Sequence, residues 1–155
     1  MTLERCLLAA QGYLELGMPE EALAELGRLS HDVQIHVDTL LLRLLILMST
    51  RRWRESVEVC ETLRRVAPEC PAGFFHGAFC LHELGRTSEA KALLMAGPSE
   101  LANEATYHYN LGCYEAVLGN LDEAVAHIHT SFAMDKKFRD IARIDPDLKS
   151  VTHLI

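Results

Sequence analysis

The chain has 155 residues, a formal net charge of −7 at pH 7, 49% hydrophobic residues and only 6% aromatic residues. This balance suits one globular domain and excludes an intrinsically disordered chain. The longest apolar run, residues 44–48, is flanked by Arg43 and Ser49 and is too short to cross a bilayer. The first residues lack the basic and apolar regions of a signal peptide, so we expect a cytoplasmic protein without membrane insertion.

The arginines and cysteines exclude two further classes. We expect no nucleic acid as a partner, because that would need a continuous basic stripe, whereas the five arginines between positions 51 and 65 form a local group. We expect this group to be a solvated helix face or to pair with acidic neighbours. The five cysteines include no C-x-x-C pair, and we interpret them as reduced thiols that serve as small hydrophobic residues.

Abundant Leu and Ala, with apolar residues at helical spacing, predict an all-α chain. In chain order, the predicted helices cover residues 2–16, 20–30, 36–50, 53–66, 71–84, 87–96, 103–118 and 121–134. A further helix is expected from Asp135 to Ile144. Another should begin at Asp145, because Asp is a good N-cap and Pro146 then takes the first helical position.

The turns between these helices recur at a fixed interval. Four turn positions stand 34 residues apart: Gly17, Arg51, Gly85 and Gly119. A small residue comes five residues after each turn: Ala22, Ser56, Ala90 and Ala124. Glycine accepts the left-handed backbone that ends a helix, and a small side chain lets two helices approach closely. One hairpin cannot bury its apolar face alone, so we expect the hairpins to stack.

This pattern resembles the tetratricopeptide repeat (TPR) family, whose period is 34 residues. The segments Asn110-Leu111-Gly112 and Ala67-Pro68 are close to the family wording. The resemblance implies a single all-α domain over residues 1–155, an α-α superhelix of four helix-turn-helix repeats followed by a capping segment. The repeats would cover residues 3–34, 35–68, 69–102 and 103–136, and the cap residues 137–155.

The chain also departs from the family pattern. Arg51 replaces the turn glycine in the second repeat, and Arg43 stands at a usually apolar position. The third repeat ends early at Gly97-Pro98, which predicts a short second helix. Glu115 occupies a place that is usually aromatic.

In this family the first helices of the hairpins line a concave groove that binds partners. The corresponding positions are three or four residues apart within each helix and therefore share one helical face. The resemblance implies these partner-binding residues: Leu7, Gln11, Leu41, Leu45, Met48, Phe75, Phe79, His82, Tyr109 and Cys113. The set is apolar and partly aromatic, and it lacks the cations that bind a carboxylate terminus. The same stripe also fits a homodimer face or intrachain core.

No residue set for catalysis emerges. The sequence holds no Gly-rich phosphate loop, H-E-x-x-H motif or nucleophile with a partner base, so we expect no enzyme, no cofactor and no metal. One metal arrangement stays open, built from His76 and Cys80 with His82 nearby. His127 and His129 are two residues apart and point about 200° apart on a helix, so one ion cannot take both.

The resemblance implies a scaffold or adaptor that binds a protein or peptide through the apolar groove. Two alternatives stay open. The first is a chaperone like those of type III secretion translocators, which are small acidic proteins of this repeat class. The second is a structural module that associates with itself through its N-terminal hairpin, for example as a homodimer.

Overall fold

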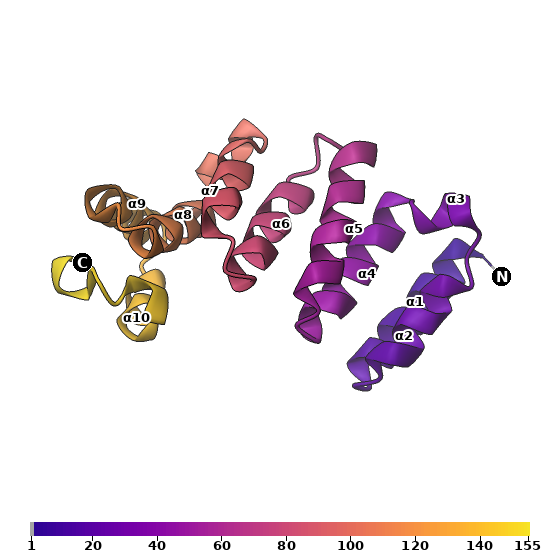
Figure 1. Cartoon of the computed structure of the whole chain (residues 1–155). Helices are drawn as coiled ribbons and strands as arrows, with labels where there is room; N and C mark the ends of the chain where they lie inside the picture. Colours follow the sequence, from indigo (N-terminus) through magenta and orange to yellow (C-terminus); the bar gives the residue numbers. More distant parts are fainter. Residues whose placement is uncertain (1) are drawn as a thin grey trace. The chain divides into compact units, whose positions relative to one another are not determined.

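The computed structural model describes residues 2–155, and this part of the chain is helical throughout, without a strand (Figure 1). It divides into two compact units, Met1–Cys80 and Leu81–Ile155, with the boundary inside α6. No helix in residues 2–155 is both long enough and apolar enough to cross a membrane.

The first unit contains the helices α1 (Leu3–Glu15), α2 (Pro19–Gly27), α3 (His31–Gln34), α4 (Val37–Ser49), α5 (Trp53–Val66) and the start of α6 (Ala72–Glu83). Helix α1 packs on α2, α4 packs on α5, and both α1 and α2 contact α4. One core cluster gathers around Cys6, Leu26 and Ile46. A second lies between α4 and α5, where Leu40 meets Leu63.

The second unit contains α7 (Thr87–Met95), a 3-10 turn at Ser99–Asn103, α8 (Ala105–Val117), α9 (Leu121–Met134) and α10 (Phe138–Ile144). Two further 3-10 turns, η2 (Pro146–Leu148) and η3 (Thr152–Leu154), follow. Helices α8 and α9 form the main pair, and η2 packs back on α8. Leu148 and Val151 of the tail are fully buried.

The predicted turn register is confirmed. Positive φ angles occur at the four turn positions: Gly17 (72°), Arg51 (57°), Gly85 (78°) and Gly119 (86°). At each turn the next amide donates back to the carbonyl five residues earlier, as Arg52 does to Leu47 at 2.9 Å. These are the bonds of a Schellman motif, which satisfy carbonyls that a helix end leaves unpaired. The predicted small residues are fully buried: Ala22, Ser56, Ala90 and Ala124.

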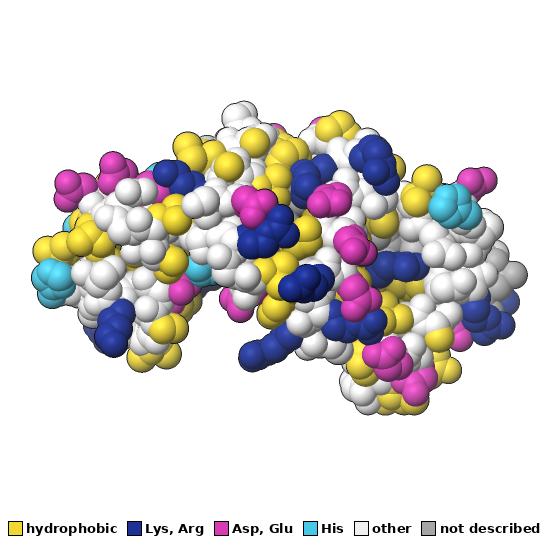
Figure 2. Space-filling model, viewed as in Figure 1, with side chains coloured by type: hydrophobic (Ala, Val, Ile, Leu, Met, Phe, Trp, Pro, Cys, Tyr) yellow, Lys and Arg dark blue, Asp and Glu magenta, His cyan; other side chains and the backbone are white. Residues whose placement is uncertain are grey.

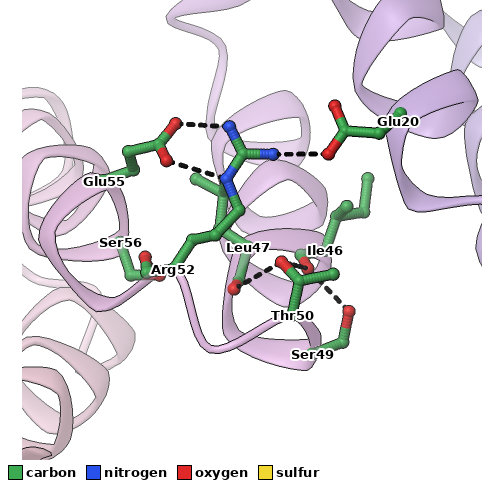
Figure 3. A network of polar contacts seen from close by, with 8 residues as sticks. All are labelled: Glu20, Ile46, Leu47, Ser49, Thr50, Arg52, Glu55 and Ser56. Carbon is green, nitrogen blue, oxygen red and sulfur yellow. Dashed lines mark hydrogen bonds and ion pairs between the residues drawn. The ribbon is translucent and has the colours of Figure 1, made fainter.

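Hydrogen bonds of neighbouring side chains stabilise the turn at Arg51 (Figure 3). The Ser49 hydroxyl donates to the Ile46 carbonyl at 2.6 Å, and the Thr50 hydroxyl donates to the Leu47 carbonyl at 3.1 Å. After the turn, the Arg52 guanidinium donates twice to Glu55 at 2.7 Å and once to Glu20 at 3.0 Å. Local hydrogen bonds therefore hold a left-handed conformation that a residue with a Cβ adopts at a cost.

The departure at Glu115 also has a local explanation. Its side chain is almost fully buried, and its carboxylate meets Lys91 Nζ at 2.7 Å and Asn120 Nδ2 at 3.2 Å. Burial of a carboxylate is tolerated when a cation and a hydrogen-bond donor compensate it. Lys91 comes from α7, so this pair joins α7 to α8.

The helix bounds differ from expectation at three places. The helix predicted over 20–30 ends at Gly27. The Gln34 side-chain amide donates to the Leu29 carbonyl at 2.8 Å, and a separate short helix, α3, begins at His31. The helix predicted from Asp135 begins at Phe138. Asp145 does act as an N-cap, accepting from the Asp147 amide, but it starts only the 3-10 turn η2 and not an α-helix. The short α7, which ends at Met95, is as expected.

Arg51→Gly should stabilise the protein, because it removes the strain of a side chain in the left-handed region, about 1 kcal/mol. The free energy of unfolding, measured by urea denaturation, is expected to rise by roughly that amount. Gly85→Ala is the matched control and should lower it by a similar amount. An unchanged stability in both variants would contradict a common role for these turns.

Candidate functional site

Three of the proposed groove residues follow one face of α4. Leu45 is 56% exposed, although it lies in the middle of the helix. Leu41 and Met48, on either side of it, are half-buried, and Leu41 packs against the Leu40–Leu63 cluster. The centre of this face is therefore an open aliphatic side chain between two that the fold already partly covers.

The four other groove residues of the first unit come from α1 and α6. Leu7 is half-buried against the first core cluster, whereas Gln11 is exposed and donates to Glu15 at 3.5 Å. Phe75 is half-buried and lies edge-on to the His76 ring. Phe79 is also half-buried and meets Trp53 of α5 edge to face, with ring centroids 5.8 Å apart. We name these four, together with Leu41, Leu45 and Met48, the apolar face.

The remaining three groove residues face the tail of the chain. Tyr109 and Cys113 on α8 are only 6% and 4% exposed, and the half-buried His82 of α6 contacts Asp147. The assignment of Tyr109 and Cys113 to an open groove is therefore corrected, because the chain's own C-terminal segment covers both side chains. The same correction applies to His82, because its ring contacts Asp147 of that segment.

A polar network fixes this segment, which we name the C-terminal corner: His82, Tyr109, Cys113, Asp145 and Asp147. The Tyr109 hydroxyl donates to Asp145 Oδ2 at 2.6 Å, and the Cys113 thiol donates to the same oxygen at 3.7 Å. His82 Nε2 lies 2.8 Å from Asp147 Oδ2, and its Nδ1 lies 2.9 Å from Thr87 Oγ1. Two carboxylates of the tail thus meet three groups of the preceding helices.

The electrostatics of the corner follow from burial and from the two carboxylates. Burial, assisted by Asp145 and Asp147, raises the pKa of the Cys113 thiol. Burial and the bond to Asp145 raise the pKa of the Tyr109 hydroxyl. The hydrogen bond to Asp147 raises the pKa of His82 despite its burial. The corner therefore favours the protonated forms of Cys113, Tyr109 and His82.

The arginines of the α5 segment behave as predicted. Arg52 pairs with Glu55 and Glu20, and the Arg64 guanidinium donates to the Gly73 carbonyl at 3.0 Å. In Figure 2, Lys and Arg side chains alternate with Asp and Glu over α5. The part of the surface seen there carries side chains of both charges.

The other histidines and cysteines considered in the sequence have the following surroundings. Burial lowers the pKa of His76 and raises the pKa of the Cys60 thiol to about 12, so Cys60 stays protonated at neutral pH. His127 faces His108 of α8, with Nδ1 atoms 3.3 Å apart. His82 is drawn to the tail.

Sequence reasoning missed the two aspartates of the corner. Asp145 was interpreted only as a helix cap, and its contact with Tyr109 spans 36 residues. The Asp-Pro-Asp spacing does signal a turn that places both carboxylates close together. Nothing in that spacing indicates which earlier helices they face.

The fold is that of tetratricopeptide-repeat proteins. MamA of Desulfovibrio magneticus RS-1 has a TM-score of 0.81 at 17% identity, over 90% of this chain and 79% of that one. TTC0263, a TPR protein of Thermus thermophilus, has a TM-score of 0.65 at 19% identity, over 85% and 73%. Identities this low show a shared fold alone. No family model matches the chain, and no curated protein matches it.

The His108–His127 pair should make the fold sensitive to acid. Burial, and then the charge of His108 and Lys91, lowers the pKa of His127, whereas Glu115 opposes this. A histidine with a lowered folded pKa takes up its proton more readily in the unfolded chain, so stability is lost as pH falls below about 6.5. The loss of unfolding free energy between about pH 7.5 and pH 5.5 should be smaller in His127→Gln.

The control for this measurement lies on the same helix. His129 is exposed on α9, and His129→Gln should leave the acid-induced loss as it is in the parent chain. Urea denaturation at the two pH values gives both numbers. An equal loss in the parent and in His127→Gln would contradict the role of the pair.

Proposed function

We propose that the protein is a non-enzymatic scaffold that binds a protein or peptide partner through the apolar face of the first unit. The observation that carries this proposal is Leu45, held 56% exposed in the middle of α4 between Leu41 and Met48. The side chains beside Leu45 are already ordered by the fold. A partner that covers Leu45 therefore causes little further loss of side-chain entropy in this face. Full burial of such a side chain contributes roughly 1.5–3 kcal/mol.

The chemistry of the face defines the partner. Apolar side chains three and four residues apart suit an amphipathic helix or an extended segment that supplies aliphatic anchors. The exposed Gln11 adds one polar group at the α1 end. Because no cation belongs to the apolar face, a carboxylate-ended peptide gains no charge partner there.

Two further observations support a non-enzymatic, cytoplasmic role. The raised thiol pKa values of Cys60 and Cys113 speak against nucleophilic cysteines. No disulfide joins the five cysteines, which lie within residues 2–155, and this suits a reducing compartment.

Self-association is a second candidate, and two exposed leucines of the first hairpin favour it, Leu8 in the middle of α1 and Leu16 at its C-terminal end. Leu16 is 74% exposed and Leu8 is 63% exposed, both outside the apolar face. A second copy that covers this hairpin would remove both from water, and exposed apolar groups of this kind mark contact surfaces when they are contiguous.

Leu45→Glu should abolish capture of the partner from a lysate while the helical circular dichroism signal stays unchanged, because a charge cannot enter an apolar contact without a partner. Phe79→Glu is a poorer choice, since it also breaks the packing on Trp53. Leu16→Glu, also exposed but outside the apolar face, is the matched control. Undiminished capture by Leu45→Glu would sink the proposal.

Leu16→Glu in turn tests the second candidate. If the N-terminal hairpin associates, sedimentation at increasing concentration should show dimers in the parent chain and in Leu45→Glu, but only monomers in Leu16→Glu. A parent chain that stays monomeric across the range would remove self-association.

A further inference from the structure

A mixed group of potential metal ligands meets in the C-terminal corner. One ligand atom each of Cys113, Asp145 and Asp147 lies within 4.8 Å of the other two. His82 adjoins this group, because its Nε2 lies 2.8 Å from Asp147 Oδ2. The four side chains come from α6, α8 and the tail at η2, so the fold brings them together from distant parts of the second unit.

The donor set points to one kind of ion. Magnesium and calcium take oxygen ligands, whereas a thiolate together with carboxylates fits zinc. Bonds of about 2.0–2.3 Å in a tetrahedral zinc site place neighbouring ligand atoms roughly 3–4 Å apart. The contact of 3.7 Å from Cys113 Sγ to Asp145 Oδ2 fits that spacing, whereas His82 contacts Asp147 from outside the group of three.

We propose that the C-terminal corner binds one Zn²⁺ ion through Cys113 Sγ and the carboxylates of Asp145 and Asp147, with a water molecule in the fourth position. This site differs from the arrangement that the sequence left open, because His76 and Cys80 take no part and the tail supplies two ligands. The ion would fasten the tail to α8.

Both carboxylate ligands have outer partners. His82 Nε2 lies 2.8 Å from Asp147 Oδ2, and Thr87 Oγ1 in turn lies 2.9 Å from His82 Nδ1. The Tyr109 hydroxyl donates to Asp145 Oδ2, and the Asp147 amide donates to Asp145 Oδ1 at 3.0 Å. Such outer contacts orient metal ligands and raise affinity.

Binding exchanges protons for the ion. The Cys113 thiol releases its proton to solvent and the sulfur binds zinc as the thiolate. Asp145 and Asp147 bind as carboxylates, and His82 keeps its contact with Asp147. No electron is transferred. Affinity should therefore fall as pH falls.

One edge of the corner is open to an incoming ion. The Asp147 side chain is 34% exposed and that of His82 is 12% exposed, whereas Cys113 is buried behind them. An ion can thus meet Asp147 first and then displace the thiol proton.

The full chain, freed of metal with a chelator, would be titrated with Zn²⁺ against a chromophoric competitor. One ion per chain is expected. Cys113→Ser and Asp147→Asn should weaken binding by about 100-fold or more, and Thr87→Val, which removes an outer contact, by about tenfold. Cys70→Ser and Asp140→Asn remove a thiol and a carboxylate outside the corner and should bind like the parent.

Cobalt gives a second readout. Co²⁺ in the parent site should show a thiolate-to-metal charge-transfer band that Cys113→Ser lacks, and circular dichroism reports whether each variant is folded. Failure of the parent to bind zinc stoichiometrically, or a cobalt spectrum without the thiolate band, would overturn the proposal. So would folded Asp147→Asn and Thr87→Val variants that bind like the parent. None of these results bears on the apolar face.

Discussion

Where α8 packs on α9, Gly112 faces Ala124 and Ile128 with no room for a side chain: a Cβ added to the glycine would lie 2.5 Å from Ile128 Cδ1 and 3.2 Å from the Ala124 carbonyl oxygen. In the other three hairpins, the positions that correspond to Ala124 also hold small, fully buried residues: Ala22, Ser56 and Ala90. Because the helices touch at these points, the larger apolar residue four positions further on, such as Ile128 or Leu26, fills the core beside them. The remaining features of the fold depend on this contact.

Close helix pairing also decides which side chains stay available. When the first helix of a hairpin packs one face on its partner helix, its opposite face stays unpacked within that hairpin. Leu45 is exposed on that face of α4. On α8 the equivalent face is not left over, because Tyr109 and Cys113 accept the tail. Both side chains donate hydrogen bonds to Asp145 there, which an aliphatic residue such as Leu45 cannot do.

The register of the fold was predictable because it depends on local chemistry. Glycine at positive φ and small residues at the pairing contact act within a few residues, so Gly17, Gly85 and Ala124 could be placed from the sequence. Arg51 was placed only by the interval, since its turn relies on hydrogen bonds from Ser49 and Thr50. The tail contacts were not predictable, because the match of Asp145 to Tyr109 depends on how two distant segments pack. The residues of the apolar face were predicted only from the resemblance to the TPR family.

The C-terminal corner has a consequence for how such a chain can gain or lose repeats. Its tail carboxylates meet His82 of one hairpin and Tyr109 of the next, so they recognise a pair of successive hairpins rather than a single one. A duplicated hairpin inserted between α7 and α8 would separate these partners unless it carried its own copy of His82. Insertions ahead of α6 would leave the pair intact. The contacts of the tail therefore depend on which residues the last two hairpins carry, and not on the number of hairpins ahead of α6.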